Sequence, residues 1–87
     1  MEAITELRKH VQGSRLVIGT DEVMKLLKHN KVAKVFAAVN CQDAVMADLK
    51  HYCTMSDCEL VELAIPNEEL GILCKKPFSI SVVGVLR

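Results

Sequence analysis

The chain has 87 residues, of which 51% are hydrophobic and 25% charged, a composition typical of a globular domain and not of a disordered tail. We expect one domain over residues 1–87, because a chain of about this size can bury about 60% of its unfolded surface. Eleven Lys and Arg balance eleven Asp and Glu, so the net charge of zero gives no support to nucleic-acid binding. A polyanionic ligand would need a locally basic face.

A helix and a strand are predicted at the start of the chain. Apolar residues at helical spacing predict an amphipathic helix over about residues 2–11 that ends near Gly13. These residues are Ile4, Leu7 and Val11. The apolar segment Leu16–Ile18 then predicts a buried strand.

A second helix is predicted directly after this strand. Gly19 lets the chain turn, and Thr20 is the expected N-cap because its hydroxyl can accept from a free backbone N–H of the first turn. Asp21 and Glu22 in that turn oppose the helix dipole. The helix should continue to about His29 with one apolar face toward the core. That face consists of Val23, Leu26 and Leu27.

The remaining elements repeat the alternation of helix and strand. Val35–Val39 is an uninterrupted apolar run, as expected of a central strand covered on both faces. A third helix should end before Asp57, with Leu60–Leu63 as the next strand. Pro66 opens a brief fourth helix, and Ser79–Leu86 is the last strand. The order predicts an α/β fold in which helices pack on a mostly parallel or mixed four-stranded sheet.

No segment resembles a membrane span or a secretion signal. The longest apolar stretches, such as Val35–Val39 and Ile80–Val85, are far shorter than the roughly 20 residues a membrane helix needs. The first nine residues mix charged and apolar side chains, unlike a signal peptide. We therefore expect a cytoplasmic protein that does not contact a membrane.

Charged residues are segregated along the chain. One basic region contains Lys25, Lys28, His29, Lys31 and Lys34, and a second contains Lys75 and Lys76. The acidic region between them contains Asp57, Glu59, Glu62, Glu68 and Glu69. Such segregation can build a basic face for a polyanion or simply solvated faces for solubility, and charge alone leaves both open.

The turn from Ile18 to Lys25 has the most informative local chemistry. It combines a helix N-terminus with free N–H groups, carboxylates that can accept from base edges, and a lysine one turn later. Those groups can read RNA, although spacing alone favours an ordinary surface ion pair between Lys25 and Asp21 or Glu22, worth roughly 0.2–0.5 kcal/mol. A single glycine is no phosphate-cradling loop, so no nucleotide cofactor is expected.

The four cysteines allow three weaker hypotheses. They are Cys41, Cys53, Cys58 and Cys74. Cys53 and Cys58 with nearby His51 approach zinc-ligand spacing, but the fold would have to gather separated residues, so we predict no metal. Disulfides are disfavoured without a secretion signal. Cys41 lies just before a predicted helix, where a reactive thiolate is stabilised, but no histidine is placed beside it by the sequence.

Four motifs in the same order and spacing resemble a known family. They are Gly19-x-Asp21-Glu22-x-x-Lys25, Asn40-Cys41, Glu69-Leu70-Gly71 and Lys76-Pro77-Phe78-Ser79-Ile80-Ser81. Together, over about residues 8–86, they resemble the kink-turn-binding ribosomal proteins of the archaeal and eukaryotic large subunit, of the seven-Ae and thirty-e type. Asn40-Cys41 and the Lys-Pro-Phe sequence are closer to the thirty-e branch.

The resemblance implies a three-layer α-β-α sandwich that binds a kink-turn, a sharply bent RNA with sheared G·A pairs, in a ribosome or other ribonucleoprotein particle. It implies RNA as the partner, neighbouring ribonucleoprotein proteins as further partners, and no catalysis. The implied RNA-binding residues are Gly19, Thr20, Asp21, Glu22, Lys25, Lys28, Lys75, Lys76, Phe78 and Ile80. Within this set, Phe78 and Ile80 would meet an extruded base, although Phe78 could instead be a core residue at a strand start.

Two residues depart from the family pattern. Asp21 stands where an asparagine is common, and an ionised carboxylate cannot donate a hydrogen bond and repels phosphate. Lys75 replaces the usual glycine after the short helix, so that loop must adopt a less permissive backbone or gain a phosphate contact. Asp21 and the neutral net charge favour a second hypothesis, a family member that no longer binds RNA and acts as a protein-interaction module, as in the growth-arrest-inducible and Pelota-like relatives.

Overall fold

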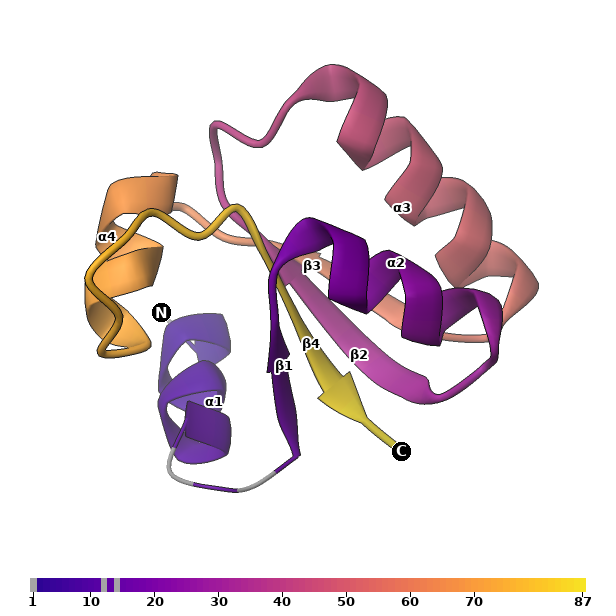
Figure 1. The fold of residues 1–87 in the computed structure, drawn as a ribbon, viewed down its shortest axis with the longest axis horizontal. Coiled ribbons are helices and arrows are strands. Elements are labelled where there is room, and N and C mark those ends of the chain that lie inside the picture. Colours follow the sequence, from indigo (N-terminus) through magenta and orange to yellow (C-terminus); the bar gives the residue numbers. More distant parts are fainter. Residues whose placement is uncertain (1, 12, 14) are drawn as a thin grey trace.

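A computed structural model of the chain describes residues 2–11, 13 and 15–87, within which four helices alternate with four strands (Figure 1). In chain order the elements are α1 (Glu2–Val11), β1 (Leu16–Ile18), α2 (Thr20–Lys28), β2 (Val32–Ala37), α3 (Asp43–Met55), β3 (Glu59–Glu62), α4 (Asn67–Leu73) and β4 (Val82–Leu86). None of these helices is long and apolar enough to cross a membrane. The predicted element order is confirmed, because each expected helix and strand is present.

The four strands form one mixed sheet in the order β1-β4-β2-β3. The last strand, β4, lies between β1 and β2 and runs antiparallel to both, whereas β2 and β3 are parallel. Leu16 pairs with Val85 on one side of β4, and Val35 pairs with Gly84 on the other. As a result, β1 near the start of the chain is hydrogen-bonded to β4 near its end.

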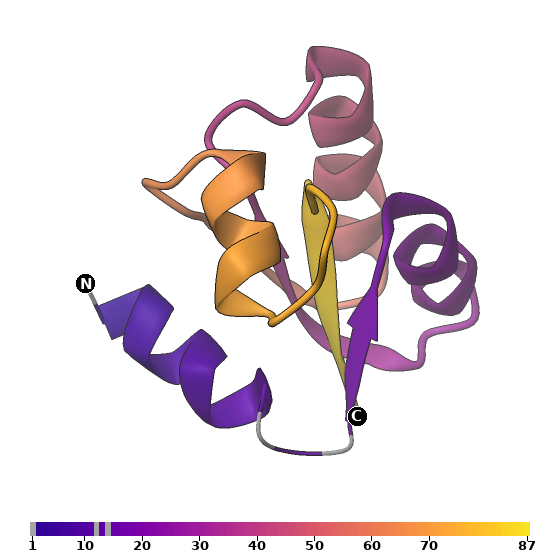
Figure 2. The same cartoon turned by 60° about the vertical axis from the view of Figure 1, so that its left-hand side comes forward.

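Helices cover both faces of the sheet, as predicted for a three-layer sandwich. Figure 2 shows α1 and α4 on one face and α2 and α3 on the other. The alternation of side chains along β2 supplies both cores, because Val35 and Ala37 pack toward α2 and α3 while Phe36 and Ala38 pack toward α1 and α4. Each fully buried aliphatic or aromatic side chain contributes about 1.5–3 kcal/mol.

Several predicted boundaries are wrong. The strand predicted to start at Val35 begins at Val32, and the strand predicted over Leu60–Leu63 spans Glu59–Glu62. The strand predicted over Val35–Val39 ends at Ala37, because the Val39 N–H donates to the Ile65 carbonyl outside the ladder and the Val39 side chain is exposed. The last strand begins at Val82 and not at Ser79. The predicted N-cap Thr20 is the first residue of α2, and Gly19 occupies the cap position.

Candidate functional site

The turn from β1 into α2 lies beside the loop that leads from α4 into β4. The Gly19 N–H donates to the Val82 carbonyl at 3.1 Å, which joins the turn to the start of β4. Between the turn and the loop lies a hollow of about 480 Å³, which we call the Phe78 hollow. Its lining residues are Leu16, Ile18, Gly19, Thr20, Lys76, Phe78, Ser79, Ile80 and Ser81. Residues some sixty positions apart in the sequence therefore share one surface.

Gly19 shapes the turn through its backbone. Its φ of 109° lies in a region that L side chains rarely adopt, while the space where a Cβ would project is open. The Val23 N–H donates to the Gly19 carbonyl at 3.0 Å, which starts the α2 ladder. No side chain among the described residues caps this helix end. The first-turn N–H groups of α2 are thus left for a ligand or water.

The first turns of α2 carry acidic and basic side chains that point to solvent. Asp21, Glu22 and Lys25 are exposed, and within the described part of the chain none of them forms an ion pair or a hydrogen bond through its side chain. The surface ion pair that spacing alone favours is therefore wrong. All three groups remain available to bind something outside the protein.

The two apolar residues of the site differ sharply in exposure. Phe78 is 57% exposed, so the alternative that its ring belongs to the core is wrong. Ile80 is only 2% exposed and packs with Phe36 and Val83 in the core under α1 and α4. Ile80 lines the hollow from below, which corrects the expectation that its side chain is presented like that of Phe78.

Three residues that were not predicted as site residues hold the Phe78 loop in place. A Cβ on Gly71 would lie 2.0 Å from the Phe78 carbonyl oxygen, so only glycine lets the loop pass this close to α4. The Asn67 carbonyl accepts from the Ile80 N–H at 3.0 Å. Asn67 in turn donates its backbone N–H to the Asn40 side chain at 2.8 Å. Asn40 and Gly71 were visible in the sequence as motif residues, but nothing indicated that they act through the loop.

The predicted lysines do not all converge on the hollow. Lys76 lines it, whereas Lys75 lines a different hollow between α1 and α4. Lys75 has a φ of 60°, so the less permissive backbone expected from the missing glycine is confirmed. Lys28 lies at the far end of α2, with its Nζ 5.3 Å from the centre of the Tyr52 ring. Of these three lysines, Lys76 is the one that lines the Phe78 hollow.

The cysteines are buried free thiols. Burial raises the pKa of Cys41, and a backbone hydrogen bond from Gln42 offsets this only in part, which disfavours a reactive thiolate. Burial, with Cys58 alongside, raises the pKa of Cys53 to about 12. Within the described residues, no three His, Cys, Asp or Glu side chains form a group that could hold a metal ion.

Comparison with known proteins identifies the family. Residues 1–87 match the family described as "Ribosomal protein L7Ae/L30e/S12e/Gadd45 family". The chain belongs to this family. Among L7Ae/L30e/S12e/Gadd45 relatives, "Large ribosomal subunit protein eL30" of Methanococcus vannielii is 31% identical over 86 residues, covering 99% of this chain and 82% of the relative. The eL30 protein of Sulfolobus acidocaldarius is 31% identical, covering 93% and 78%, so the predicted thirty-e branch is confirmed.

Solved structures agree on the L7Ae-type fold. A "protein with unknown function" from Bacillus halodurans has a TM-score of 0.84 at 18% identity, covering 97% of this chain and 83% of that one. The "Giardia lamblia 15.5kD RNA binding protein" has a TM-score of 0.80 at 18% identity, covering 99% and 72%. At this level of identity the likeness concerns the fold alone.

Proposed function

We propose that residues 1–87 act as one RNA-binding domain that recognises a kink-turn, as a component of the large ribosomal subunit or of another cytoplasmic ribonucleoprotein particle. Support comes from the family, from relatives named as large-subunit proteins, and from a structural neighbour named as an RNA-binding protein. Kink-turn RNA offers splayed bases and a bent backbone that proteins read by shape and stacking.

One observation carries the proposal: the start of α2 and the exposed ring of Phe78 lie on the same open surface. Gly19 allows the RNA to approach the backbone, while Glu22 accepts from a guanine edge and fixes the register. Such a charged hydrogen bond is worth about 1.5–3 kcal/mol. Phe78 stacks on an extruded base, and Lys25 and Lys76 add a salt-dependent attraction for phosphate.

The test is a titration of a kink-turn hairpin and of a scrambled hairpin of equal length with the whole protein. Glu22→Ala and Lys25→Ala should each weaken kink-turn binding by about tenfold or more, or about 1.4 kcal/mol, without unfolding the protein. Matched controls are Asp48→Ala and Lys31→Ala, which remove exposed charges of the same sign away from the hollow. Equal affinity of the wild type and both site variants would contradict the assignment.

The same titration separates two other hypotheses. A protein-interaction module, favoured by the neutral net charge and by Asp21, would bind the kink-turn and the scrambled hairpin equally poorly at moderate salt. We propose binding in place of catalysis, since the buried Cys41 has a raised pKa. Titration of the Cys41 thiol should therefore give a pKa above the ordinary value of about 8.5.

A further inference from the structure

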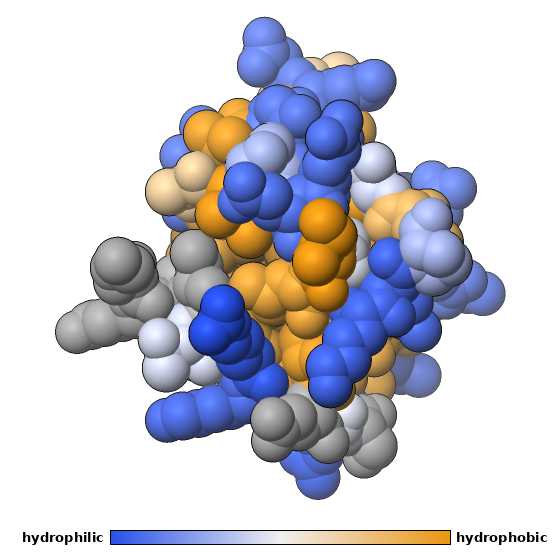
Figure 3. All heavy atoms as spheres, turned by 90° about the vertical axis from the view of Figure 1, so that its left-hand side faces the viewer, coloured by the Kyte–Doolittle hydropathy of each residue, from blue (hydrophilic) through white to orange (hydrophobic). Residues whose placement is uncertain are grey.

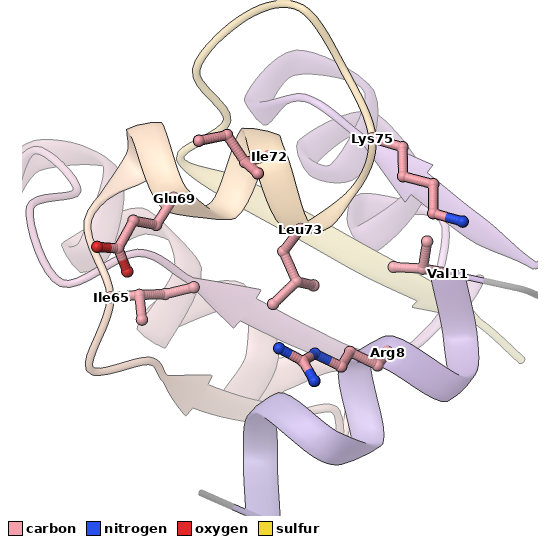
Figure 4. A pocket seen from close by; sticks show the side chains of 7 residues that line it. All are labelled: Arg8, Val11, Ile65, Glu69, Ile72, Leu73 and Lys75. Carbon is pink, nitrogen blue, oxygen red and sulfur yellow. The ribbon is translucent and has the colours of Figure 1, made fainter.

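The face formed by α1 and α4 carries an apolar strip that runs between hydrophilic side chains (Figure 3). Part of this strip is a hollow of about 530 Å³, which we call the α1–α4 groove (Figure 4). Its apolar lining consists of Val11, Ile65, Ile72 and Leu73, and its charged lining of Arg8, Glu69 and Lys75. The volume is within the range of about 300–1,000 Å³ that is usual for binding pockets.

The apolar part of the groove is partly open to solvent, because Val11, Ile65 and Leu73 are half-buried against the core whereas Ile72 is exposed. Ile72 is 74% exposed, although it lies in the last turn of α4 beside the buried Leu70 and Gly71. Leu73 points from α4 toward α1, and Arg8 extends from α1 across the space below it (Figure 4). An exposed apolar side chain beside partly exposed ones, with charged residues around them, is typical of an interaction site.

The basic side chains of the groove have no partner among the described residues. Within the described part of the chain, neither Arg8 nor Lys75 forms an ion pair or a hydrogen bond through its side chain. Lys34, close by on β2, is instead held by both Glu6 and Glu59. Two cations and one carboxylate among the described lining residues give the groove an excess of positive charge, which complements an acidic ligand.

The chemistry of the lining favours protein over RNA as this ligand. RNA-binding surfaces commonly use aromatic rings for base stacking, and none of the described residues that line the groove is aromatic. Val11, Ile65, Ile72 and Leu73 make the lining mainly aliphatic, and a peptide can offer aliphatic side chains together with carboxylates. We propose that the α1–α4 groove docks an acidic, apolar segment of a partner protein, whose aliphatic side chains cover Ile72 and Leu73 and whose carboxylate pairs with Arg8 and Lys75.

The test uses the whole ¹⁵N-labelled protein and a synthetic peptide with leucines at helical spacing and glutamates between them. Amide shifts should change at Val11, Ile72 and Leu73, and saturation gives the affinity. Two matched peptides, with lysine for every glutamate or serine for every leucine, should bind at least about tenfold more weakly, since one tests charge and the other burial.

Two variants locate the site. Ile72→Ser and Arg8→Glu should each lower the affinity for the acidic peptide by about fivefold or more, while leaving the affinity for kink-turn RNA unchanged. Matched controls are Met55→Ser, an exposed apolar residue at the end of α3, and Lys9→Glu, the same charge reversal one residue along α1. Because the peptide and RNA are titrated separately, loss of one does not depend on the other.

Four outcomes would overturn the proposal. These are an absence of shifts with the acidic peptide, equal binding of the lysine peptide, shifts centred on Gly19 and Phe78, and unchanged peptide affinity in both variants. Loss of RNA affinity in Ile72→Ser would assign the groove to RNA instead. Self-association of the wild type that Ile72→Ser abolishes would assign it to a second copy of the chain.

Discussion

The Phe78 hollow and the α1–α4 groove lie on either side of the same short helix and receive adjacent lysines, yet their chemistry differs. The hollow combines a glycine turn, a helix N-terminus and an exposed aromatic ring. The groove combines aliphatic side chains with Arg8 and Lys75. The turn and the exposed ring suit an RNA whose bases are unstacked and can stack on the ring. The aliphatic surface with charges at its edge suits a peptide. Lys75, in a left-handed backbone conformation, lines the groove, whereas Lys76 lines the hollow.

Gly71→Ala should have the largest effect on stability, and it should disturb the Phe78 hollow more than the α1–α4 groove. The added methyl would meet the Phe78 carbonyl, so the loop must move, at a cost typical of overpacking of about 1–3 kcal/mol. At an exposed glycine within a helix, the same change would instead raise the stability by up to about 1 kcal/mol. Denaturant unfolding and RNA titration measure both effects, with Glu68→Ala on the same helix as control. Unchanged stability would show that the loop tolerates the methyl.

Phe78→Ala should sharpen the comparison by removing the stacking ring alone. Loss of one stacked base corresponds to about 1–3 kcal/mol, or about 5- to 150-fold weaker kink-turn binding. Stability should change little because the ring is largely exposed. Titration of RNA and of the acidic peptide with the same variant checks this. A drop in peptide affinity alone would reverse the roles of the two surfaces.

Lys75→Gly should stabilise the protein, since a left-handed residue other than glycine costs about 1–2 kcal/mol. Part of this gain is offset by the greater freedom of glycine in the unfolded chain, leaving about 0.5–1 kcal/mol. The denaturation midpoint should rise, peptide affinity should fall, and RNA affinity should stay constant. Lys76→Gly, at the neighbouring position, should not raise the stability and should instead lower the affinity for RNA. Equal responses of the two lysine variants would contradict the division between hollow and groove.

The smallest expected effect concerns the ion pair that attaches α1, which forms one wall of the groove, to the sheet. The Lys34 ammonium, 2.7 Å from the Glu6 carboxylate, lowers the pKa of Glu6. A lowered carboxyl pKa stabilises the fold above the ordinary value of 4.5 and loses this contribution as the pH falls through the folded pKa. Glu6→Gln should therefore cost about 0.2–1 kcal/mol at pH 7, the range of partly exposed pairs, and progressively less as the pH falls below 4.5. A pH-independent difference in unfolding free energy would contradict this ion pair.

The sequence predicts many of the helices and strands of this protein, because interactions between residues close in sequence determine them. The bounds of α1 and β1 follow from apolar spacing, and the mixed four-stranded sheet follows from the element order and the family resemblance. The turn at Gly19 and the acidic start of α2 are likewise visible, since a helix N-terminus has chemical preferences that a few residues satisfy. The ordered motifs, read together, indicated the family.

Tertiary contacts decided the rest. The burial of Ile80, the exposure of Phe78 and the late start of β4 depend on how the loop crosses Gly71, a backbone contact that the spacing of apolar residues does not report. The placement of Lys75 and Lys76 in different hollows is likewise visible only in the folded chain. The α1–α4 groove requires α1 and α4, separated by more than fifty residues, to pack on one face of the sheet. Sequence spacing encodes which face a residue occupies on its own element, whereas which elements meet is set by the packing of the whole chain.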